Sequence, residues 1–184
     1  MTGGHGAPHG AENKGVALLI AILALFLALA EVGGKSAQTE ALNNNVQAAN
    51  LWAFFQARSI RQTQLRTAVE QAELDKTEVN RAAIQAQQSR WTATVNRWES
   101  EPETGEGRRE LMTRAQAAEG KRDRNMERYH MFEYSSAAFQ VAIVVASASI
   151  IAGVALLVWF AGGLGLVGVG LMMLGFFAPG LIHF

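Results

Sequence analysis

The sequence lacks cysteine and has only 3 prolines among its 184 residues. The absence of cysteine excludes a disulfide framework, a thiolate metal site and a cysteine nucleophile. The scarcity of proline, in a chain without a repeated module, argues against a β-rich or solenoid fold. The 16 Lys and Arg residues are balanced by 16 Asp and Glu residues and form no basic cluster. This charge balance argues against nucleic acid as a partner, because such proteins carry a basic surface.

The first long apolar run extends from Gly15 to Ala30 without a charge. With its flanks it reaches about 20 residues, which lets a helix cross a bilayer. We therefore predict a transmembrane helix over residues 14–34. The small residues Ala28 and Ala30 leave a cleaved secretory signal as the alternative. We favour a retained anchor, because the single Lys that precedes the run is offset by Glu12.

The segment before this run is rich in glycine and has no apolar periodicity. We predict that residues 1–13 are a disordered tail, because the segment buries too little surface to offset the chain entropy. His5 and His9 could bind a metal together only if the tail were helical, which Gly6 and Pro8 oppose. We therefore expect no metal site and no cofactor.

The carboxy-terminal third is apolar, with no Asp, Glu, Lys or Arg after Glu133. We predict two further transmembrane helices, over residues 136–161 and 164–183, with the turn at Gly162 and Gly163. So short a turn implies an antiparallel pair. Each helix carries a stripe of small residues, which lets membrane helices approach closely where lipid supplies no hydrophobic drive. The stripes consist of Ala142, Ala146, Ser149 and Gly153 on the first helix, and of Ala161, Gly165, Gly168 and Gly175 on the second.

The polar middle of the chain, residues 35–135, is rich in good helix formers. Interruptions are predicted near 100–107, where Pro and Gly cluster, and near 75–77, where Asp75 and Glu78 are spaced like an acidic capping box. Two breaks would let the chain return to the bilayer, which one unbroken arm would overshoot. We therefore predict an all-α integral membrane protein, with a coiled-coil-like helical hairpin or three-helix stalk inserted between the first and second spans.

Two groups of aromatic residues in this insert are candidate interaction sites. The first consists of Trp52 and Phe55, followed by Gln56, Arg58 and Arg61. The two arginines either bind anionic headgroups or a partner's acidic patch, or cap the edges of a packed helical seam, which is the interpretation we favour.

The second group is formed by Trp91 and Trp98, which share a coiled-coil-like stripe with Ile84 and Val95. Such a stripe should face another helix. The candidates are residues 111–129 of the same chain and the same surface of a neighbouring subunit.

Catalytic residues do not form a recognisable constellation in this sequence, so we expect no enzyme. His130 and Glu133 are spaced to meet on a helix, as boundary residues rather than as catalysts. We predict a non-enzymatic scaffold or complex-associated subunit that forms a homo-oligomer in the membrane. The alternative is a small oligomeric channel or transport accessory, with Gln140, Ser147 and Ser149 facing the path.

Basic residues set the expected orientation in the membrane. Lys121, Arg122, Arg124 and Arg128 precede the second span, whereas the opposite side has only Lys14. The positive-inside rule therefore predicts that the helical stalk is cytoplasmic.

The order of these features, from the anchor to the closing apolar hairpin, resembles the bacterial inner-membrane proteins grouped as domain of unknown function 4337. The most specific part is the segment from Asn50 to Arg61, NLWAFFQARSIR, where Arg58 occupies the basic position of the motif. The resemblance covers nearly the whole chain and implies a three-span membrane protein with a helical insert. It implies no activity, but it directs attention to Trp52, Phe55, Gln56, Arg58 and Arg61.

Overall fold

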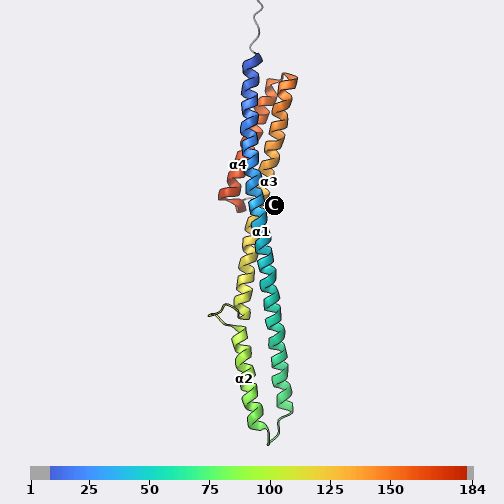
Figure 1. The fold of residues 1–184 in the computed structure, drawn as a ribbon, viewed down its shortest axis with the longest axis vertical. Coiled ribbons are helices and arrows are strands. Elements are labelled where there is room, and N and C mark those ends of the chain that lie inside the picture. The colour runs from blue at the N-terminus through green and yellow to red at the C-terminus, as the bar shows by residue number, and fades with distance from the viewer. Residues whose placement is uncertain (1–8, 182–184) are drawn as a thin grey trace, which may run out of the picture. The chain divides into compact units, whose positions relative to one another are not determined.

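The fold consists of helices and their connections (Figure 1). The computed structural model describes residues 9–181, with side chains from residue 14 onward. No strand occurs within these residues, which confirms the predicted all-α class. Three of the helices, α1, α3 and α4, contain segments long and apolar enough to cross a membrane. The elements are α1 (His9–Leu74), α2 (Arg81–Glu99), α3 (Arg108–Ala152), α4 (Ala155–Phe177) and a short 3₁₀ helix, η1 (Pro179–Leu181).

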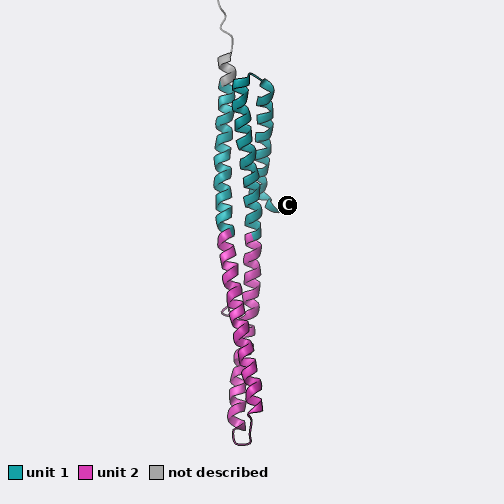
Figure 2. Cartoon of the chain, turned by 90° about the vertical axis from the view of Figure 1, so that its right-hand side faces the viewer, with its two compact units in different colours: residues 1–41, 123–184 teal, residues 42–122 magenta. Residues whose placement is uncertain are grey.

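The chain divides into two compact units, which Figure 2 shows in different colours. Unit 1 comprises residues 1–41 and 123–184, and unit 2 comprises residues 42–122. Unit 1 therefore takes its residues from both ends of the chain, and unit 2 is inserted between them. Both α1 and α3 contribute residues to each unit.

One seam of buried and half-buried side chains follows α1 through both units. Its residues alternate at spacings of three and four, the 3.5-residue repeat of helices that pack as coiled coils. The same face of α1 therefore supplies the core of each unit. In unit 1 the seam consists of Val16, Ile20, Leu23, Leu27, Ala30, Gly34, Ala37 and Ala41. In unit 2 it consists of Asn44, Ala48, Leu51, Phe55, Arg58, Gln62, Leu65, Val69 and Ala72.

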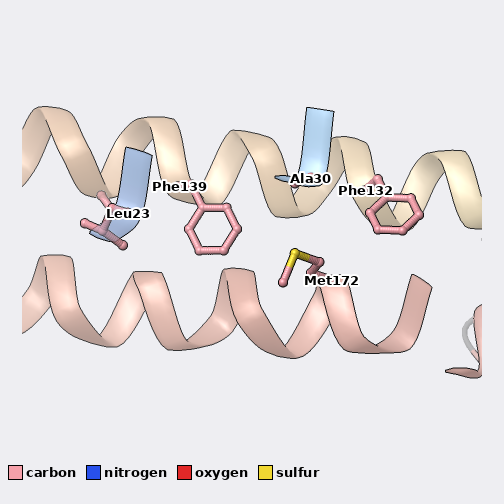
Figure 3. Packing of buried hydrophobic residues seen from close by; sticks show 6 residues of the cluster. Leu23, Ala30, Phe132, Phe139 and Met172 are labelled. Carbon is pink, nitrogen blue, oxygen red and sulfur yellow. The ribbon is translucent and has the colours of Figure 1, made fainter. Parts of the chain in front are cut away.

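The core of unit 1 lies where α1, α3 and α4 meet. Phe132 and Phe139 of α3 are almost fully buried and lie beside Met172 of α4 (Figure 3). Leu23 and Ala30 of α1 complete the same cluster. Large rings on α3 therefore fill the space that small or flexible residues leave on the two neighbouring helices.

Glycines on α4 make this close approach possible. A Cβ atom on Gly168 would lie 2.8 Å from the ring of Phe139, and one on Gly165 would lie 2.6 Å from Leu23. The Gly168 carbonyl also accepts a hydrogen bond of 2.8 Å from the buried Ser135 hydroxyl. Most residues of the two predicted small-residue stripes are buried inside unit 1: Ala142, Ala146, Ser149, Ala161, Gly165, Gly168 and Gly175.

The turn between α3 and α4 lies at Gly153, so the predicted turn at Gly162 and Gly163 was wrong. Gly153 has a φ of +66°, a left-handed conformation that glycine adopts without a steric penalty. It therefore leaves the predicted stripe and ends α3. Gly162 and Gly163 lie inside α4, because glycine in a helix costs only about 1 kcal/mol and does not break it. The observed turn leaves about 30 Å of α3 after Glu133, which matches the hydrocarbon thickness of a bilayer.

The two ends of the chain also differ from the predicted boundaries. Because α1 begins at His9, residues 9–13 are helical rather than part of a disordered tail. Residues 1–8 of that predicted tail, and the paired side chains of His5 and His9, lie outside the described residues. At the other end α4 stops at Phe177, short of the predicted 183, and residues 182–184 are not described.

Unit 2 has its breaks after Leu74 and between residues 100 and 107, where the sequence predicts interruptions. The first break is organised by Asn80, whose side-chain amide donates to the Asp75 carbonyl at 3.1 Å. The Asn80 side-chain oxygen in turn accepts a bond of 2.6 Å from the Thr77 N–H. The predicted capping box at Asp75 and Glu78 was wrong, because these residues form the turn itself and α2 starts only at Arg81.

Replacing Gly168 by alanine should destabilise unit 1 by about 1–3 kcal/mol, because the new methyl group would overlap the Phe139 ring. Gly170→Ala is the matched control, since a Cβ atom there meets nothing within 4 Å. The full chain in detergent micelles would be unfolded by heat and followed by circular dichroism. Equal melting temperatures for the two variants would contradict the packing described here.

Candidate functional site

The first group of candidate interaction residues lies on α1 in unit 2 and divides between two faces. Trp52, Phe55 and Arg58 are half-buried, on the side of α1 that packs against other helices. Gln56 and Arg61 are exposed. The five residues therefore do not form one continuous surface.

Trp52 and Phe55 connect α1 with α3. The Trp52 indole N–H donates a hydrogen bond of 2.9 Å to the Glu119 carboxylate. The rings of Trp52 and Phe55 meet edge to face with centroids 5.4 Å apart. The Arg108 guanidinium lies 5.5 Å from the centroid of the Phe55 ring, in a cation–π contact. Buried Leu51 and Leu111 belong to the cluster against which the two rings pack.

Arg58 connects α1 with the end of α2 and the following loop. Its guanidinium pairs with Glu106 at 3.0 Å and lies 3.9 Å from Glu101. The same group is 5.7 Å from the centroid of the Trp98 ring, and only 12% of the side chain is exposed. Arg58 therefore belongs to a packed seam, whereas Arg61 is exposed and forms no ion pair within the described part of the chain.

The tryptophan stripe of α2 packs against α1. Val95 is buried, and Trp91 and Trp98 are half-buried. The Gln62 amide of α1 donates to the Val95 carbonyl at 3.0 Å, and the Gln88 amide of α2 donates to the Val69 carbonyl at 3.0 Å. The predicted partner within the chain, residues 111–129, was wrong, because the stripe packs against α1 instead. The short turn that follows α1 brings α2 back along α1, so the stripe faces α1.

A network of glutamates and arginines closes the loop between α2 and α3. Glu99 accepts hydrogen bonds from Arg108 at 3.0 and 3.1 Å, from Arg109 at 3.3 Å and from Gln62 at 3.3 Å. These bonds, with that from Arg108 the strongest cause, lower the pKa of Glu99 to about 2. Ionised Glu99 therefore joins all three helices of unit 2.

Glu110, near the start of α3, holds the other end of this loop. It accepts bonds from the Ser100 hydroxyl at 2.6 Å and from the Glu101 N–H at 3.2 Å. The bond from Ser100 is the main reason why the pKa of Glu110 lies below its ordinary value. Gly107 lies under these groups, where a Cβ atom would overlap the Glu110 carboxylate and the Glu101 backbone. Position 107 therefore requires glycine, because the Glu110 carboxylate and the Glu101 backbone approach it closely.

Sequence reasoning missed Gln62, Glu99 and Arg108, which are polar residues of the core of unit 2. A usable signal exists for Gln62, because it continues the three-and-four spacing that runs through Phe55 and Arg58. No such signal exists for Glu99, one of several glutamates around the loop. Only the packing of α2 against α1 distinguishes Glu99 from the other glutamates.

In unit 1 the polar residues near the apolar segment of α3 mostly bond within their own helix. His130 lies 3.5 Å from Glu133, which confirms the predicted contact. The hydroxyls of Ser147 and Ser149 donate to carbonyls of the preceding turn, at 2.8 and 2.6 Å. Gln140 differs: it is exposed, and its amide makes no hydrogen bond within the part of the chain that the structure describes.

The acidic residues at the loop of unit 2 are engaged in contacts within the chain. Among the described residues no group of three or more His, Asp or Glu could hold a metal ion. Glu99, Glu106 and Glu110 are already paired with cations or hydrogen-bond donors. The side chains left for a partner are outward ones, among them Phe54 and Ile60, which are 55% and 59% exposed.

The comparisons with known proteins identify the family. The family described as Domain of unknown function (DUF4337) matches residues 12–178, which is most of the chain. The chain therefore belongs to this family, as its resemblance suggested. No curated protein and no solved structure matches it significantly.

Arg58→Ala should destabilise unit 2 by about 1–3 kcal/mol, because it removes both the ion pairs and the stacking on Trp98. Arg61→Ala, one helical turn away on the exposed side, should change the free energy of unfolding by less than about 0.5 kcal/mol. Hydrogen exchange of the intact chain, read on peptides of α2, would measure both effects. Similar exchange in the two variants would mean that Arg58 is not a packing residue.

Glu99→Gln should reveal a pH-dependent contribution to stability. Because folding lowers the pKa of Glu99 from 4.5 to about 2, its contribution is complete above pH 4.5 and is lost as the pH falls through about 2. The difference should be about 2 kcal/mol at neutral pH, less than the full shift gives, since the carboxylate keeps some contact with water. Melting of both proteins across this pH range tests the prediction. A stability difference that stays constant down to pH 2 would refute it.

Proposed function

We propose that this member of the DUF4337 family is a non-enzymatic integral membrane protein that works as a subunit of a homo-oligomeric scaffold. Its three apolar helices would anchor it in the bacterial inner membrane, with unit 2 on the cytoplasmic side, as the positions of Lys and Arg favour. The tight packing of α1, α3 and α4 around Phe132 and Phe139 suits such an anchor.

The observation that carries the proposal of self-assembly is the exposed amide of Gln140. It lies seven residues beyond Glu133, about 10 Å further along α3, among apolar residues. Its neighbours Val141 and Val144 are 51% and 66% exposed, so this face of α3 would meet lipid in a single chain. A primary amide that faces hydrocarbon loses its hydrogen bonds to water, which costs free energy unless another helix supplies partners.

A second copy of the chain supplies the simplest partner. An amide has both a donor and an acceptor, so two Gln140 side chains related by a two-fold axis can exchange two hydrogen bonds. Hydrogen bonds of this kind between membrane helices stabilise association by roughly 0.6–2 kcal/mol. Gln140 would therefore contribute to self-association without being its sole source.

The test compares the mass of the extracted particle for the natural chain and for Gln140→Leu. We expect an oligomer in lipid nanodiscs, whose dissociation constant rises roughly 3- to 30-fold in the variant, as the loss of 0.6–2 kcal/mol implies. Ser147→Ala is the control, because its hydroxyl is already bonded within α3. A natural chain that is monomeric at all concentrations in the membrane would refute the proposal.

A small channel is the second candidate, because Gln140 of several copies could line a path between them. Ion flux in liposomes made from the same preparation separates the two functions. Flux that the Gln140→Leu variant abolishes would favour the channel. An oligomer that conducts no ion under any gradient would exclude the channel and favour the scaffold function.

A further inference from the structure

We infer that the outward face of α1 in unit 2 pairs with the same face of a second copy of this chain. The inference rests on the proposed homo-oligomer and names the extramembrane surface through which it forms. The face, here called the outer stripe, consists of Leu42, Val46, Ala49, Ala53, Ala57 and Ile60, all of them exposed.

The outer stripe has the spacing of a second packing seam. Its residues follow one another at intervals of three or four, as those of the buried seam do, and they lie on the opposite side of α1 from Leu51, Phe55 and Gln62. Leu42, Val46 and Ile60 are each about 60% exposed, at 61%, 58% and 59%. A helix with apolar residues on both sides has more apolar surface than α2 and α3 cover.

The charge pattern favours a second copy as the occupant. No charged residue lies between Glu40 and Arg58, although charged residues occur on both sides of this segment. A two-fold axis places each residue near its own counterpart, so a charge on the stripe would face a like charge. A neutral stripe avoids this repulsion, whereas a charged partner such as anionic lipid headgroups would find no cation within it.

The membrane supplies the orientation that such pairing needs. Copies inserted in the same direction present α1 in parallel, so that Val46 and Ala53 of one copy can meet Val46 and Ala53 of the other. The three consecutive alanines of the stripe, Ala49, Ala53 and Ala57, allow the helix axes to approach to about 8 Å. The helices α2 and α3 pack on the buried seam, on the side of α1 opposite the outer stripe. Pairing of two copies through the outer stripe therefore does not displace them.

Single cysteines test the pairing in the full chain, which has none of its own. Val46→Cys and Ala53→Cys should form a disulfide-linked dimer on oxidation in native membranes. Asn45→Cys is the matched control, because Asn45 is also exposed but points about 100° away around the helix. Linkage at position 45 equal to that at position 46, or linkage of Val46→Cys to a protein of another mass, would overturn the inference.

Opposite charges give a second and independent test. Val46→Glu and Val46→Lys should each reduce stripe pairing at least tenfold, measured by co-purification of two differently tagged copies. Mixed expression of the two variants should restore it, which simple misfolding would not allow.

Particle mass distinguishes a failure of outer-stripe pairing from a failure of the proposed homo-oligomer. If the natural chain is an oligomer and both charge variants have the same particle mass as the natural chain, pairing through the outer stripe is refuted and the proposed function stands. A monomeric natural chain would overturn both.

Discussion

The structure depends on one constraint, the 3.5-residue repeat that α1 maintains from Val16 to Ala72. A repeat of this length keeps one face of a helix turned toward its neighbours over many turns. In unit 1 that face meets apolar residues of α3 and α4. In unit 2 it meets Leu111, Ala115 and Ala118 of α3 and Val95 and Glu99 of α2. The seam residues of α1 change from apolar in unit 1 to partly polar in unit 2, while their spacing stays the same.

The polar part of the seam determines what unit 2 can do. Gln62, Glu99 and Arg108 form one hydrogen-bonded network, and Arg58 pairs with Glu106 of the following loop. Partly buried networks of this kind are stabilising only when complete. These residues fix the arrangement of three helices and a loop. They leave exposed residues of α1 on the side opposite Phe55 and Arg58, where we propose that a partner binds.

The sequence predicted the helical class and the region of each break in unit 2, because glycine, proline and charge are local signals. It did not predict the turn at Gly153, since the pair Gly162 and Gly163 is the stronger local signal. Gly162 and Gly163 continue α4, and a Cβ atom on either would meet nothing within 4 Å, so packing does not require glycine at these two positions. The partner of the tryptophan stripe was missed for a related reason. A stripe shows that a helix is covered, but only the length of the preceding turn shows by which helix.

In this description α1 has two packing faces, one used within the chain and one that we propose is used between chains. Electron paramagnetic resonance of the full chain with a single spin label on Ala53→Cys, in nanodiscs, measures this most directly. With helix axes about 8–10 Å apart, the labels of two copies should broaden each other's spectra, and dilution with unlabelled protein should remove the broadening. A spectrum that is the same before and after dilution would contradict the claim.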